Sequence, residues 1–133
     1  MAVTGSCHCG AVRIAVPGAP EWAARCNCSI CKRTGALVAY YRPDEVQVEG
    51  QTATYLTGDR LIRFHHCPAC ACHTHWSANP EALAGELPDE LRDVLATRMG
   101  INARLLDGYA ERDGRSLIDG RELELRFFDN ADA

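Results

Sequence analysis

Three cysteines lie within six positions of the segment RCNCSICKRTG, at Cys26, Cys28 and Cys31. Three thiolates can bind one Zn²⁺ and leave its fourth coordination position open to water or substrate, which is the arrangement of a catalytic zinc. Such a centre carries a net negative charge, which the neighbouring Lys32 and Arg33 could offset, or they could hold an anionic substrate. The alternative for these two residues is a solvated surface turn. The spacing of the cysteines therefore predicts a metal centre that can carry out chemistry.

Four further cysteines form two pairs, Cys7-x-Cys9 and Cys67-x-x-Cys70. Pairs of this kind lie in turns between strands, where backbone N–H groups can point at sulfur, and two pairs can close a tetrahedral four-cysteine zinc site. A closed site is structural, and its metal binding contributes to the free energy of folding. We therefore expect two zinc ions per chain, one structural and one with an open coordination position.

The roles of the eighth cysteine and of the histidines stay open. Cys72 either competes as a ligand or packs as a buried free thiol. A histidine that completed the three-cysteine site would make that site structural, and the candidates surround the cysteine pairs: His8, His65, His66, His73 and His75. His66 is the first candidate because it directly precedes Cys67, and His73 and His75 are expected to share one face of a strand. An iron–sulfur cluster is less well supported, because C-x-C-x-x-C lacks a fourth cysteine at the usual spacing.

Length, composition and charge limit the classes of function. The 133 residues suit a single domain, residues 1–133. The net charge of −4 argues against a nucleic-acid partner, which requires a basic surface. No apolar run reaches the roughly 18 residues of a membrane span, and the N-terminal segment lacks the features of a signal peptide, so we expect a cytoplasmic protein. In that reducing compartment, eight cysteines favour metal ligation over disulfides.

The elements predicted to position these cysteines are mainly short strands separated by turn residues, which is typical of an all-β body. One short helix is predicted near 88–96, with Pro88 in its first turn and Gly100 at its end. In the last strand, charged residues alternate with Leu123, Leu125 and Phe127, which predicts one wet face and one apolar face. The other expected strands lie at about 2–6, 11–16, 36–43, 45–50, 52–59, 61–66, 72–79 and 100–108.

The order of the cysteine motifs resembles that of the glutathione-dependent formaldehyde-activating enzyme family, which is related to centromere protein V. The matching segments are GSCHCG at 5–10, CNCSIC at 26–31 and CPAC at 67–70. The resemblance covers about residues 2–77, and MGINARLLDG extends it to about 108. It implies a mainly β fold, a β-tent of small antiparallel sheets packed around zinc sites. It also assigns Cys7, Cys9, Cys67 and Cys70 to a structural zinc, and Cys26, Cys28 and Cys31 to a catalytic zinc.

The activity that this resemblance implies is that of a zinc-dependent carbon–sulfur lyase acting on a thiol–aldehyde adduct. The family condenses glutathione, a small-molecule thiol, with formaldehyde to give S-hydroxymethylglutathione, and catalyses the reverse reaction. The alternatives are a non-catalytic zinc-binding interaction module and a thiol-based redox or metal sensor. Three positions depart from the family pattern: Asn27 where histidine is frequent, His66 where an aromatic residue is frequent, and Ala71 where glycine is usual. The motifs do not specify the true substrate, the glutathione-binding residues or the oligomeric state.

Overall fold

The computed structural model describes residues 2–133, in which the strands form three sheets. The main sheet has seven strands in the order β13-β3-β4-β9-β8-β7-β6. Their bounds are β3 Trp22–Cys26, β4 Val38–Tyr41, β6 Ala53–Leu56, β7 Ile62–His66, β8 His73–Ala78, β9 Met99–Asn102 and β13 Glu124–Phe128. The mainly β fold expected from the sequence is therefore confirmed.

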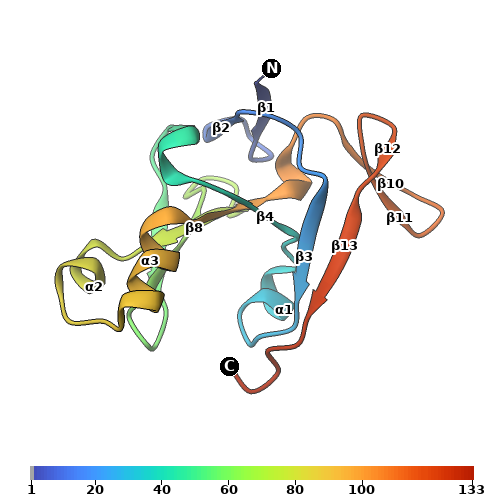
Figure 1. Ribbon diagram of the computed structural model, residues 1–133. Helices are drawn as coiled ribbons and strands as arrows, with labels where there is room; N and C mark the ends of the chain where they lie inside the picture. The colour runs from blue at the N-terminus through green and yellow to red at the C-terminus, as the bar shows by residue number, and fades with distance from the viewer. Residues whose placement is uncertain (1) are drawn as a thin grey trace.

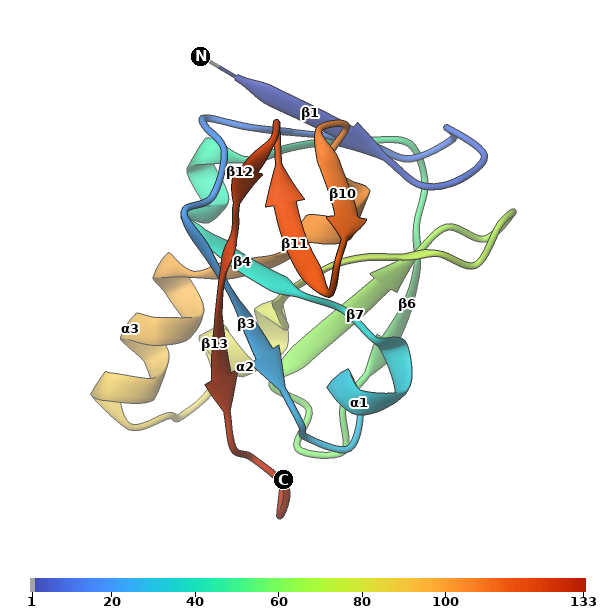
Figure 2. The same cartoon turned by 90° about the vertical axis from the view of Figure 1, so that its right-hand side faces the viewer.

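Two three-stranded sheets complete the β structure of these residues. One joins β1 (Val3–Ser6), β2 (Arg13–Val16) and β5 (Gln47–Glu49), and the other joins β10 (Tyr109–Arg112), β11 (Arg115–Ile118) and β12 (Arg121–Glu122). Figures 1 and 2 show β1 and β2 beyond one end of the β3–β13 pair, with the β10–β12 sheet close to β13.

The main sheet is apolar on both faces in its central strands. On one face, Leu37 and Ile101 pack with Ile14, Ile118 and Leu123 of the smaller sheets and their connections. On the opposite face, a second cluster joins Ala24, Ala36, Val38, Phe64 and Trp76 and is flanked by Trp22, Tyr40 and Phe128. Successive residues of a strand point to opposite faces, which explains why consecutive residues of β3 and β4 enter different clusters.

Three α-helices and two 3₁₀ turns connect the strands of residues 2–133. The helices are α1 (Cys31–Thr34), α2 (Pro80–Ala84) and α3 (Asp89–Thr97), and the 3₁₀ turns are η1 (Pro43–Glu45) and η2 (Ala103–Leu105). Helix α3 confirms the helix predicted near 88–96, with acidic Asp89 and Glu90 in its first turn. Arg92 fastens α3 to α2 by donating hydrogen bonds to the carbonyl oxygens of Leu83 and Gly85. Within residues 2–133, no helix is both long and apolar enough to cross a membrane.

Two expectations about the C-terminal strands are wrong. The sheets are not entirely antiparallel, because β13 pairs with β3 in parallel, with Phe128 opposite Cys26. The apolar face predicted for the last strand does not extend to its end, because Leu123 is buried whereas Phe127 is 63% exposed. The parallel pairing therefore carries the chain end past β3 and leaves Phe127 beside a cavity.

Two further expectations fail for local reasons. The strand expected over 100–108 ends at Asn102, whose side-chain oxygen accepts a hydrogen bond from the backbone N–H of Arg104 and so starts η2. His73 and His75 do not share a face, because the ladder between β7 and β8 shifts register between His65 and His66. The ring of His73 packs on Phe64 and that of His75 stacks on His65, which are consecutive residues of β7.

Candidate metal centres and adjoining cavity

The four-sulfur group contains Cys7 and Cys9 from the turn between β1 and β2, and Cys67 and Cys70 from the turn between β7 and β8. Their sulfur atoms all lie within 4.8 Å of one another. The Sγ of Cys9 is 3.7 Å from that of Cys7 and 3.6 Å from that of Cys67. Sulfurs bound to one tetrahedral zinc at about 2.3 Å lie about 3.8 Å apart, whereas a disulfide bond measures about 2.05 Å. The group therefore fits one metal ion, and none of the eight cysteines is in a disulfide.

Backbone N–H groups point at two of these sulfurs, as expected for such turns. Val12 N–H donates to Cys7 Sγ at 3.3 Å, and Ala69 N–H donates to Cys67 Sγ at 3.4 Å. The second turn keeps a left-handed residue even though glycine is absent, because Ala71 adopts a φ of 64°. Cys72 lies outside the four-sulfur group and packs against it.

The three-sulfur group is built by the end of β3, the following loop and the start of α1. Cys26 ends β3, Cys31 begins α1, and the sulfurs of Cys26, Cys28 and Cys31 lie within 4.8 Å of one another. Within residues 2–133 no histidine joins this group, so its donors are three sulfurs. The loop is closed by Gly35, which has a φ of 72° and donates its N–H to the carbonyl oxygen of Cys31.

The electrostatics of the three-sulfur group favour a bound cation. Burial, reinforced by the neighbouring Cys28 and Cys26, raises the pKa of the Cys31 thiol well above its ordinary value. Burial also acts to raise the pKa of Cys28, but the backbone N–H of Cys31 and the adjacent thiols outweigh it, so that this pKa is lowered. Three thiolates this close repel one another, and a divalent cation removes that penalty. The donor set therefore fits a thiophilic divalent ion such as zinc.

A cavity of about 570 Å³ adjoins the three-sulfur group. This volume lies within the range of about 300–1,000 Å³ that is typical of small-molecule sites. Of the two basic residues expected beside the three-cysteine group, only Lys32 lines this cavity. Arg33 instead donates a hydrogen bond to the carbonyl oxygen of Ser29. The residues of the lining that bear on chemistry are Cys26, Cys31, Arg25, Lys32, Arg104 and Phe127.

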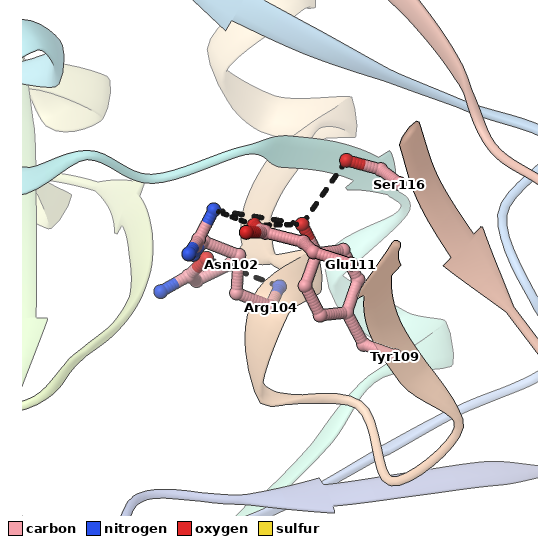
Figure 3. A network of polar contacts seen from close by, with 5 residues as sticks. All are labelled: Asn102, Arg104, Tyr109, Glu111 and Ser116. Carbon is pink, nitrogen blue, oxygen red and sulfur yellow. Dashed lines mark hydrogen bonds and ion pairs between the residues drawn. The ribbon is translucent and has the colours of Figure 1, made fainter. Parts of the chain in front are cut away.

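Arg104 is held at this cavity by the polar network of Figure 3. Its guanidinium forms an ion pair with Glu111 and lies 5.5 Å from the ring centre of Tyr109. The Tyr109 hydroxyl donates to Glu111 Oε1 at 2.6 Å and lies 3.1 Å from the Ser116 hydroxyl. The hydrogen bond from Tyr109, followed by the charge of Arg104, lowers the pKa of the Glu111 carboxyl. Arg104 is therefore a fixed positive charge.

The sequence does not mark Arg25, Arg104 and Phe127 as cavity residues. Arg25 precedes the first cysteine of the central motif, but Arg104 and Phe127 are far from every cysteine in sequence. Arg104 lies in η2, directly after β9, and Phe127 lies in β13; both reach the cavity because β9 and β13 belong to the same sheet as β3. No local motif marks such residues.

The chain is similar to a known protein family and to a solved structure. The sequence model of the glutathione-dependent formaldehyde-activating enzyme family matches residues 2–87. The chain belongs to this family. The crystal structure of a Rhodobacter sphaeroides protein, a structural genomics target, is similar to the chain, with a TM-score of 0.65 and 27% sequence identity over 92% of this chain and 99% of that one. No curated protein matches the sequence.

The residues matched by the family model include only part of the cavity wall. All seven clustered cysteines and Lys32 lie within residues 2–87, whereas Arg104 and Phe127 lie beyond them. The cavity therefore combines residues of the family motifs with residues of the C-terminal third of the chain.

Proposed function

We propose that residues 1–133 form a single zinc-binding domain that acts as a carbon–sulfur lyase on a thiol–aldehyde adduct, with glutathione and formaldehyde as the first pair to test. Cys26, Cys28 and Cys31 hold the catalytic zinc, and Cys7, Cys9, Cys67 and Cys70 hold a structural zinc. The observation that carries this proposal is the cavity of about 570 Å³ that opens directly onto Cys26 and Cys31. The four-sulfur group, by contrast, already has a complete ligand set.

The reaction requires few groups from the protein. One carbon–sulfur bond forms between the thiol sulfur and the aldehyde carbon, and the thiol proton is transferred to the aldehyde oxygen; the reverse reaction breaks the same bond. Zinc bound by three cysteines supplies a Lewis acid that lowers the pKa of a thiol. The chain itself must hold the substrate so that its sulfur lies beside the three-cysteine group.

The positive charges around the cavity support an acidic thiol such as glutathione. Within residues 2–133, neither Arg25 nor Lys32 forms an ion pair, so both can bind a carboxylate of the substrate. Arg104 adds a third positive charge, although Glu111 neutralises part of it. Charged hydrogen bonds of this type orient a ligand more strongly than neutral ones.

Metal content combined with two serine variants tests the proposal. The purified protein is expected to contain two zinc ions per chain. Cys28→Ser should abolish thiol–aldehyde turnover, followed by NMR, while the far-UV circular dichroism stays native. Cys67→Ser should unfold the chain, because it breaks the site that joins two hairpins. Cys72→Ser, outside both groups, serves as the matched control and should retain both zinc and activity.

Unchanged turnover in a Cys28→Ser protein that has lost one zinc would show that the metal at the three-cysteine group is not the catalyst. Absence of turnover in the two-zinc wild-type protein with every thiol–aldehyde pair would refute the lyase. The second candidate is then a thiol-based sensor, which is favoured by the partial exposure of Cys26 and Cys28. A sensor would release one zinc reversibly on treatment with hydrogen peroxide and would show no turnover with any thiol–aldehyde pair.

A further inference from the structure

The C-terminal segment, residues 128–133, lies against the loop that carries the three-sulfur group. Strand β13 runs parallel to β3 and brings Phe128 opposite Cys26. Figures 1 and 2 both show the chain continuing from there past the ends of β3 and β13 towards α1. Ser29 N–H donates to the carbonyl oxygen of Ala133 at 3.2 Å, so the segment contacts the loop at both its ends.

Asn27, between the first two cysteines of the group, makes most of this contact. Its backbone N–H donates to the carbonyl oxygen of Phe128 at 3.2 Å. Its side-chain amide donates to Asp129 Oδ1 at 3.0 Å, and its side-chain oxygen accepts from the backbone N–H of Asn130 at 2.6 Å. Asn27 therefore binds three successive residues of the segment, which gives a structural reason for asparagine at this position.

The consequence is that Asn130 reaches a ligand sulfur. Its side-chain amide donates to Cys26 Sγ at 3.3 Å. Among residues 2–133, the other N–H groups that donate to sulfurs of the two cysteine groups belong to the backbone, as with Cys28 N–H on Cys26 Sγ at 3.4 Å. Hydrogen bonds to a thiolate stabilise its charge, and three thiolates on one divalent ion leave a net negative charge to be stabilised.

We propose that Asn130, held in place by Asn27, is a positioning residue that stabilises the Cys26 thiolate as a metal ligand. The inference rests on the proposed zinc at the three-cysteine group. Hydrogen-bond partners outside the ligand set typically change metal affinity or activity by about 10- to 100-fold. The C-terminal segment thus contributes to retention of the metal, although it lies outside the part of the chain that the family motifs cover.

Release of zinc to a chromophoric chelator tests this role in the two-zinc protein. Release is expected in two phases, and the phase missing from Cys28→Ser identifies the three-cysteine site. Asn130→Ala should accelerate that phase about tenfold and leave the other unchanged. Asn130→Asp should accelerate it further, because a carboxylate repels the thiolate. Asn27→Ala should change it in the same direction, and Asp132→Ala, in the same segment, is the matched control.

Cobalt provides a readout that looser packing alone would not change. Removing a hydrogen bond raises the energy of the sulfur electrons, so the thiolate-to-cobalt charge-transfer band should move to longer wavelength in Asn130→Ala but not in Asp132→Ala. Release rates within twofold of wild type in both Asn130 variants, with an unshifted band, would overturn the inference. Failure of lyase activity in a protein that shows these shifts refutes the proposed function alone, whereas a three-cysteine group that takes up neither zinc nor cobalt refutes both.

Discussion

Ala71 shows strain at a single residue of the structural metal site. Its φ of 64° places an alanine in the left-handed region, next to the last cysteine of the four-sulfur group. A non-glycine residue there costs about 1–2 kcal/mol, which is partly offset by the greater chain entropy of glycine in the unfolded state. We expect Ala71→Gly to increase the free energy of unfolding of the zinc-bound protein by about 0.5–1 kcal/mol, measured by urea denaturation.

Ala69 is the matched control for this substitution because it lies in the same turn, is exposed, and is not among the residues with positive φ. Ala69→Gly should lower the free energy of unfolding, since glycine gains only unfolded-state entropy there. Equal changes in the two variants would show that the left-handed conformation of Ala71 carries no strain.

His75 is a buried base whose protonation should oppose folding. Burial, followed by the charges of His65 and His73, lowers its pKa to about 3, whereas an unfolded histidine has a pKa of about 6.5. Between these values the unfolded chain binds the extra proton, so stability falls as the pH falls through this window and is unaffected above it. The contribution should reach about 2 kcal/mol at pH 5. The measurement is the slope of unfolding free energy against pH.

The variant His75→Gln separates this effect from protonation of the cysteines. The thiolate contribution is common to both proteins, so the difference between their slopes belongs to His75. Parallel slopes between pH 5 and 6.5 would mean that His75 is protonated in the folded state.

At the scale of residues, the cysteines could be predicted but their neighbours could not. Ligand spacing is a local property, and both sulfur groups formed as their spacing predicted. Asn130 and Phe127 carry no local signal, because they meet Cys26 and its cavity only through a strand pairing across about a hundred residues of chain. The apolar alternation of the last strand predicted that the side chain of Phe127 faces the core.

At the scale of elements, the contact between β9 and β8 leaves no room for a side chain. Gly100 lies opposite Trp76, and a Cβ atom built on it would come within 2.0 Å of Trp76 Nε1. Trp76 cannot move freely because it also packs edge-on against Tyr40. Gly100→Ala should therefore lower the free energy of unfolding by about 2 kcal/mol in urea denaturation.

Gly58 provides the control for this prediction, because nothing lies within 4 Å of a Cβ at that position. Gly58→Ala should leave the free energy of unfolding within about 0.5 kcal/mol of wild type. Similar values for both alanine variants would mean that Trp76 repacks without cost.

Elements with strong local signals were predicted, and those that depend on distant partners were not. The β6–β7 hairpin follows from alternation and turn residues, and α3 follows from helical spacing and the acidic residues of its first turn, all of which act within about ten residues. Helix α1 has only four residues and no periodic pattern, so nothing in the motif distinguishes it from a loop. The register shift beside His66 changed which faces His73 and His75 occupy, and such a bulge has no sequence signature here.

At the scale of the whole molecule, the distribution of charge matters more than its sum. The chain has a net charge of −4, yet the cavity beside Cys26 and Cys31 is lined by Arg25, Lys32 and Arg104 and by no acidic side chain. Local positive charge attracts an anionic substrate over about 10 Å at 0.1 M salt, and the attraction weakens as salt is added. An acidic protein can therefore still select an acidic thiol.

The basic lining of the cavity predicts how KM depends on salt. KM for glutathione, with formaldehyde in excess, should rise about three- to tenfold between 20 and 500 mM sodium chloride, because screening removes the attraction to Arg25 and Lys32. KM for the neutral thiol 2-mercaptoethanol should change less than twofold. Arg25→Ala and Lys32→Ala should each raise KM for glutathione at low salt and flatten its salt dependence. Arg42→Ala, whose side chain pairs with Asp44 away from the cavity, should do neither. If KM rose equally with salt for both thiols, the salt effect would belong to the chemical step. The basic cavity would then have no role in selecting the substrate.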